Sequence, residues 1–135
     1  MLYFDNSIVS RIFDAETPQP IGEYLREHKA EPWGIPATVA WEYLNFYDST
    51  SRQQRERQKL EQHFQEIAPI TIDVAVDAAT ISTLLSRHDI TLDAADLLHA
   101  ATARANNATF VTADANDFNK QPIRDLLSVD IIFLS

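Results

Sequence analysis

The second half of the chain contains two pairs of acidic residues whose types and spacing favour metal chemistry. Asp93 and Asp96 stand three residues apart at the start of a helical segment, and Asp114 and Asp117 follow an apolar, β-rich run. Open α/β sheets place their ligands at the carboxyl ends of strands. Each acid also has a structural explanation, because Asp93 is a good helix N-cap and acids in a first helical turn suit the helix dipole.

Two acids from the first half of the chain are candidates to join these pairs. Asp5 follows the apolar run 2–4, and its structural alternative is an N-cap for the next helix. Glu42 lies in a helical segment among apolar and aromatic residues, where it either reaches solvent or is held for a purpose. Together with the later pairs, they define a candidate catalytic set: Asp5, Glu42, Asp96 and Asp114.

Convergence of these four carboxylates would decide the chemistry of the site. Carboxylates in one pocket repel one another and raise one another's pKa. Mg²⁺ or Mn²⁺, which takes oxygen ligands, relieves that repulsion. No Lys or Arg lies between Leu92 and Ala103. Negative charge that develops on a phosphate in the transition state therefore has to be stabilised by a metal ion. This chemistry suits in-line hydrolysis of a phosphodiester.

Composition predicts one soluble domain over residues 1–135 and excludes several classes of site. With 11 Lys and Arg against 20 Asp and Glu, the net charge of −9 argues against a passive nucleic-acid-binding surface. The absence of cysteine excludes disulfides and thiolate metal sites. Only two glycines occur, which excludes a Walker loop and a dinucleotide-binding fingerprint. We expect a cytoplasmic protein, since no apolar run is long enough to span a bilayer.

Strands and helices alternate along the whole sequence. This pattern, with short and mostly apolar strands, predicts an α/β fold with a mostly parallel sheet covered by helices on both faces. The expected strands are 2–4, 33–35, 68–72, 108–112 and 129–134. The expected helices are 7–13, 21–29, 36–49, 52–66, 73–88 and one that begins at Asp93, with 122–127 as a connector. Pro36 is expected in the first turn of its helix and Asp73 as a cap.

The helix expected at 52–66 carries the chain's one basic cluster, formed by Arg52, Arg55, Arg57 and Lys59. Such clusters are usually solvated helix faces, and a contact with nucleic acid is the less common alternative.

Four segments together resemble PIN-domain proteins, most of all the VapC-type toxin ribonucleases of toxin–antitoxin pairs. They are FDNS at the first strand, IPATVAWEYL around Glu42, LDAADLLHAATA around Asp96 and FVTADANDF around Asp114. The resemblance covers essentially the whole chain. It implies a three-layer α/β/α sandwich with a five-stranded, mostly parallel sheet, a Mg²⁺ or Mn²⁺ site, cleavage of RNA and a homodimer.

By the family pattern, Asp5, Asp96 and Asp114 are the metal ligands and Glu42 completes the catalytic set. Ser7 and Thr112 are expected as polar supports. The first segment reads Asp5-Asn6-Ser7 where members often read D-T-N or D-S-S, which leaves Ser7 at the supporting position. Three further residues have alternatives: Asp117 in place of Asp114 as ligand, Asp93 as only a cap, and His99 as either a site residue or a structural histidine.

The resemblance also implies a partner, an antitoxin whose DNA-binding part brings the complex to DNA. A carboxylate cluster on a chain of charge −9 attracts Arg, so we expect a basic inhibitor segment. The aromatic residues Trp41, Tyr43, Phe46 and Tyr47 either line a groove for it or belong to the core. Two other functions compete: a PIN fold that only binds partners, and a Mg²⁺-binding receiver-type signalling domain. The receiver lacks support because Asp5 has no acidic neighbour.

Overall fold

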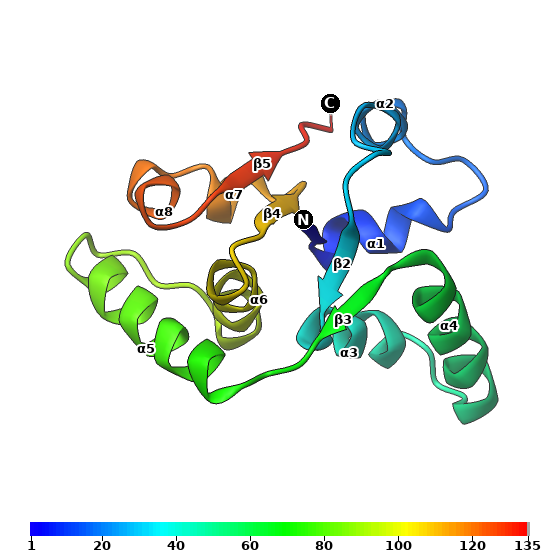
Figure 1. Ribbon diagram of the computed structural model, residues 1–135, viewed down its shortest axis with the longest axis horizontal. Coiled ribbons are helices and arrows are strands. Elements are labelled where there is room, and N and C mark those ends of the chain that lie inside the picture. Colours follow the sequence, from blue (N-terminus) through cyan, green and yellow to red (C-terminus); the bar gives the residue numbers. More distant parts are fainter. Residues whose placement is uncertain (135) are drawn as a thin grey trace.

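The computed structural model describes residues 1–134, and within them five strands form one parallel sheet (Figure 1). The strand order is β3-β2-β1-β4-β5. The strands are β1 (Leu2–Phe4), β2 (Trp33–Pro36), β3 (Glu66–Ala68), β4 (Thr109–Thr112) and β5 (Val129–Ile131). Every neighbouring pair is parallel, as the alternation of apolar runs and helices in the sequence predicted.

Helices cover both faces of this sheet, which makes the expected three-layer α/β/α sandwich. One core lies under α5, α6 and α8, and the other under α1 to α4. In Figure 1 the first group lies on the left and α1, α2 and α4 lie on the right. The helices are α1 (Asn6–Ile12), α2 (Gln19–Glu27), α3 (Ala37–Asn45), α4 (Thr50–His63), α5 (Ile72–Ser86), α6 (Ala94–Ala105), α7 (Ala115–Phe118) and α8 (Gln121–Leu126).

The strand order brings the candidate site residues together at one edge. β1 is central and pairs with both β2 and β4. The chain leaves β1 toward β2 and leaves β4 toward β5, so these two connections diverge to opposite sides, which is where open sheets bind ligands. Phe4 stands beside Val111 in the register, so Asp5 and Thr112 follow as neighbours. Helix α6 packs closely because Ala100, Ala101 and Ala103 are fully buried and small.

Four expectations in the middle of the chain are wrong. Pro36 ends β2 and precedes α3, which stops at Asn45 rather than near Ser49. The strand expected at 68–72 is instead 66–68, because Ile72 already begins α5. The cap of α5 is Thr71, whose hydroxyl accepts from the backbone N–H of Val74, and Asp73 lies inside the first turn.

Two expectations near the end of the chain also need correction. The connector expected at 122–127 is helical as α8, and the short helix α7 precedes it. The last strand covers only 129–131 of the expected 129–134. Within this strand, Asp130 accepts a hydrogen bond from the Tyr24 hydroxyl at 2.6 Å.

Candidate metal centre

Asp5 is the most firmly held acid of the site. It follows β1, is only 5% exposed and caps α1, with Oδ1 accepting from the backbone N–H of Asn6 at 2.8 Å. Its Oδ2 accepts from the Thr112 hydroxyl at 2.7 Å and from the Ser7 hydroxyl at 3.0 Å. The Asp5 side chain therefore acts as the N-cap considered from the sequence and also belongs to the candidate site. Three donors on one carboxylate hold it in a fixed orientation.

Ser7 and Thr112, expected as polar supports, connect Asp5 to the loop after β4. The Ser7 hydroxyl accepts from the backbone N–H of Ala113 at 3.0 Å, and the Thr112 hydroxyl accepts from the backbone N–H of Asp114 at 3.0 Å. Both hydroxyls thus donate to Asp5 and accept from the neighbouring backbone. The start of this loop is fixed relative to the end of β1 by these bonds.

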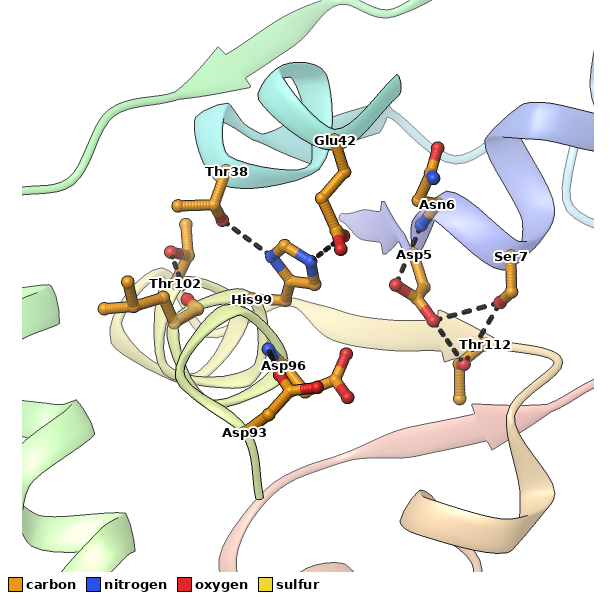
Figure 2. A network of polar contacts seen from close by, with 11 residues as sticks. Asp5, Asn6, Ser7, Thr38, Glu42, Asp93, Asp96, His99, Thr102 and Thr112 are labelled. Carbon is orange, nitrogen blue, oxygen red and sulfur yellow. Dashed lines mark hydrogen bonds and ion pairs between the residues drawn. The ribbon is translucent and has the colours of Figure 1, made fainter. Parts of the chain in front are cut away.

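Asp96 faces Asp5 from the first turn of α6, and Asp93 orients that turn. The Asp93 side chain accepts from the backbone N–H of Asp96 at 2.9 Å, so the N-cap expected for Asp93 is present. Figure 2 shows the carboxylates of Asp5, Glu42 and Asp96 turned toward one shared space. Oxygen atoms of Asp5 and Asp96 and a ring nitrogen of His99 all lie within 4.8 Å of one another.

Asp114 and Asp117 also lie close to the Asp96 carboxylate. Asp114 caps α7 by accepting from the backbone N–H of Asp117 at 3.0 Å. One oxygen of each lies within 4.8 Å of an oxygen of Asp96 and of each other. Asp96 is therefore the residue that two candidate ligand groups share, and both alternatives for the last ligand lie beside it.

Glu42 joins the site through His99, which is fully buried between α3 and α6. The His99 Nε2 contacts Glu42 Oε1, and its Nδ1 lies 2.7 Å from the Thr38 hydroxyl (Figure 2). The sequence left two alternatives for Glu42, a side chain that reaches solvent or one that is held for a purpose. The Glu42 side chain is 31% exposed and is also paired with His99, so each alternative holds in part. Thr38 is the member that sequence reasoning missed, because a threonine inside a helix carries no signal of its own.

The electrostatics of this cluster fit a divalent cation. Burial raises the pKa of Asp96 to about 7, and the charges of Asp93, Asp5, Asp117 and Glu42 add to that rise. Burial and the neighbouring Asp114 raise the pKa of Asp117 as well. Within residues 1–134 no Lys or Arg forms an ion pair with any of these acids. A set of oxygen donors without a cationic partner is the donor set that Mg²⁺ and Mn²⁺ take.

Solved structures share this fold. The toxin–antitoxin complex from Klebsiella pneumoniae matches with a TM-score of 0.73 and 21% identity over 100% of each chain. VapBC2 from Rickettsia felis, bound to a DNA fragment from their promoter, matches with a TM-score of 0.77 and 20% identity over 97% of this chain and 98% of that one. FitAcB from Neisseria gonorrhoeae matches with a TM-score of 0.75 and 22% identity over 96% of each.

Sequence comparison assigns the family directly. No curated protein sequence matches the chain. The family model described as the PIN domain matches residues 2–123, which include every candidate site residue named above. The fold, the clustered acids and this match agree with the resemblance seen in the four sequence segments, and the chain belongs to the PIN domain family.

Proposed function

We propose that this protein is a metal-dependent endoribonuclease with Asp5, Glu42, Asp96 and Asp114 as its catalytic set. The observation that carries the proposal is the convergence of buried and half-buried carboxylates without a Lys or Arg partner among residues 1–134. Family membership supports a nuclease in general, and PIN nucleases generally depend on divalent metal. RNA as the substrate comes from the resemblance to VapC-type toxins.

Each residue has a defined task in this proposal. Asp5, Asp96 and Asp114 would hold Mg²⁺ or Mn²⁺, with Asp117 as the alternative to Asp114 and Glu42 completing the site. A bound divalent cation supplies Lewis acidity at the phosphate and an activated water for hydrolysis. Ser7 and Thr112 fix Asp5 by hydrogen bonds, and Asp93 fixes the start of α6.

Asp96→Asn tests the catalytic assignment. The change removes the negative charge of Asp96, the one residue that belongs to both groups of candidate metal ligands. Within residues 1–134 the Asp96 side chain accepts no hydrogen bond that the change would break. We expect Mn²⁺-dependent cleavage of a mixed RNA pool to be abolished, with an unchanged circular dichroism spectrum. The matched control is Asp73→Asn, an exposed acid in the first turn of α5, which should cleave like wild type. Full activity of Asp96→Asn would refute the assignment.

We further propose that the chain is the toxin of a toxin–antitoxin pair, acts in the cytoplasm as a single domain and forms a homodimer. The support is its fold likeness to structures of such complexes, three of which contain DNA. Contact with DNA would come through the antitoxin. Within residues 1–134 no helix is both long and apolar enough to cross a membrane.

The partner proposal rests on charge and is tested by co-purification. A net charge of −9 and unpaired acids favour an antitoxin segment that places Arg or Lys among Asp5, Glu42 and Asp96. We expect the small protein encoded beside this gene to form a stable complex that cleaves RNA poorly. A complex that cleaves as fast as the free protein would contradict this inhibitory role.

A further inference from the structure

A pocket of about 200 Å³ opens between α1 and α3, beside the candidate metal centre. Its two walls differ in chemistry. The wall from α1 and the turn that follows it carries an amide, a hydroxyl and a carboxylate, whereas the wall from the end of α3 is aromatic. The lining residues are Asn6, Ser10, Asp14, Tyr43, Phe46 and Tyr47.

Both walls continue directly from the acids of the site. Asn6 follows Asp5 and donates its backbone N–H to the Asp5 carboxylate at 2.8 Å, while its side chain points away from that carboxylate (Figure 2). Tyr43 follows Glu42, and Phe46 stands four residues after Glu42, on the same side of the helical turn. A nucleotide adjacent to a phosphate at the acids is therefore within reach of this pocket.

The aromatic wall is rigid at its base and open at its rim. The Tyr43 hydroxyl donates to Glu56 Oε1 at 2.6 Å, and the Tyr43 side chain is only 5% exposed. Phe46 packs edge-on against Tyr47, with ring centroids 5.2 Å apart, yet remains 83% exposed. A flat ring that is held in place and faces solvent is the arrangement on which unpaired bases stack.

The polar wall offers hydrogen-bond acceptors that lack donors. Asn6 Oδ1 is buried and has no hydrogen-bond partner within the described residues. The Asp14 carboxylate is exposed and forms no ion pair with any residue of 1–134. A ligand that brings N–H donors pairs with the exposed Asp14 carboxylate, whereas an apolar side chain of a protein partner leaves that carboxylate without a donor.

We propose that this pocket binds the base adjacent to the scissile phosphate and prefers guanine. The proposal rests on the proposed ribonuclease function and adds a base preference to it. A base combines two aromatic faces with a hydrogen-bonding edge, which matches the two walls. Guanine presents N1–H and an N2 amino group on its Watson–Crick edge, and uracil presents a single N–H between two carbonyls. Arg52, whose guanidinium lies 4.8 Å from the Tyr47 ring centroid, adds positive charge near the rim for a neighbouring phosphate.

Binding of short RNAs to the full-length Asp96→Asn protein tests the pocket without cleavage. The probes are five-nucleotide RNAs that carry G, A, C or U at the central position in a uridine background. Affinity is followed by NMR through the amide signals of Asn6, Ser10 and Phe46. We expect the G probe to shift these signals and to bind about tenfold more tightly than the all-uridine probe.

Two substitutions locate the effect in the pocket. Phe46→Ala should weaken binding of the G probe about tenfold, the size of one lost stacking contact. Asp14→Asn should reduce the ratio of G to U affinities. Phe133→Ala is the matched control, because Phe133 is also a highly exposed phenylalanine, at 61%, and does not line the pocket. Both phenylalanines are exposed, so neither change removes core packing.

The outcomes separate this proposal from the ribonuclease proposal. A preference for G that Asp14→Asn reduces, together with weaker binding in Phe46→Ala, supports the pocket even if wild type cuts no RNA, in which case only the nuclease proposal fails. Mapped cuts in a random RNA pool should show the same preference at one position beside the cut. Equal affinity for G and U overturns the proposal, as does an effect of Phe46→Ala no larger than that of Phe133→Ala. So does a loss of antitoxin binding alone, which would assign the pocket to a protein partner.

Discussion

Thr38 controls Glu42 through a single imidazole ring. A carboxylate only accepts hydrogen bonds, so His99 must donate from Nε2 to Glu42. In the neutral ring Nδ1 then lacks a proton and accepts from the Thr38 hydroxyl, 2.7 Å away. Glu42 therefore sets the ring tautomer, and the Thr38 hydroxyl holds the other ring nitrogen, so that His99 keeps a fixed orientation toward the Glu42 carboxylate. His99 is thus both a buried structural histidine and a residue that positions the site.

Thr38→Val tests this chain of hydrogen bonds, because valine keeps the shape of threonine and removes the donor. Removing a hydrogen-bond partner that orients a metal-binding side chain typically lowers activity or metal affinity ten- to a hundredfold. We expect kcat for RNA cleavage to fall by about that factor, with little change in KM. Thr38→Ser restores the hydroxyl and should recover most of kcat. Equal activity in the valine variant, or a serine variant as slow as valine, would show that Thr38 has only a packing role.

At the scale of elements, Glu56 joins α4 to α3. It is 1% exposed and accepts from Tyr43 at 2.6 Å, from Arg52 at 2.9 Å and from Lys59 at 3.0 Å. Burial by itself raises the pKa of Glu56, but the hydrogen bonds from these three residues outweigh burial and lower the pKa to about 2. A polar helix is thus attached by a buried carboxylate as well as by Leu60.

Glu56→Gln should destabilise the protein by about 1–3 kcal/mol, the cost of leaving buried polar groups poorly paired. Because the folded pKa lies below the ordinary value of 4.5, the stabilisation is present above pH 4.5 and is lost as pH falls toward 2. Urea unfolding should therefore show a smaller gap between wild type and variant at pH 3 than at pH 6. Glu61→Gln, which removes an exposed pair with Arg57, should change stability by less than about 1 kcal/mol. A gap that does not change with pH would contradict the role of the Glu56 charge.

The sequence predicted the order of the strands and helices better than it predicted the contacts that their polar side chains make. Apolar runs separated by helical segments led directly to the parallel sheet, since each strand lies buried between helices. The basic face of α4 could not be interpreted, because nothing marks Glu56 as the buried partner of Arg52 and Lys59 in a helix of almost wholly polar residues. Helices α7 and α8 were missed because four and six residues are too few for a helical period to show.

At the scale of the whole molecule, metal binding should appear in stability. A ligand that binds only the folded state stabilises it by about 2.7 kcal/mol at a hundred times its Kd. We expect millimolar Mn²⁺ to raise Tm by several degrees in wild type. Asp96→Asn should melt higher than wild type without metal, because one repelling charge is gone, and should gain little from Mn²⁺. Calorimetry on both proteins and on Asp73→Asn measures this, and an equal gain in all three would place the metal elsewhere.

The candidate site was predictable to the extent that it depends on strand ends. Asp5 and Asp114 follow the ends of β1 and β4, which the strand order makes neighbours, and Asp96 lies in the first turn of α6, so the sequence pattern indicated all three. The contact of His99 with Thr38 joins residues 61 positions apart, through side-chain directions that no local pattern records. The same holds for the pocket between α1 and α3, whose walls meet only in the folded chain.

The hydrogen bond between Asp5 and Thr112 joins residues 107 positions apart, and it has a consequence for protein synthesis. The central strand β1 leaves the ribosome early but must wait for β4 before its second edge is paired. Until then Asp5 has neither the Thr112 hydroxyl nor the acids that follow it. The candidate site therefore cannot assemble before β4 has been synthesised, and we expect fragments that end before residue 109 to show no metal-dependent cleavage of RNA. The order of the strands thus ties assembly of the site to the synthesis of β4.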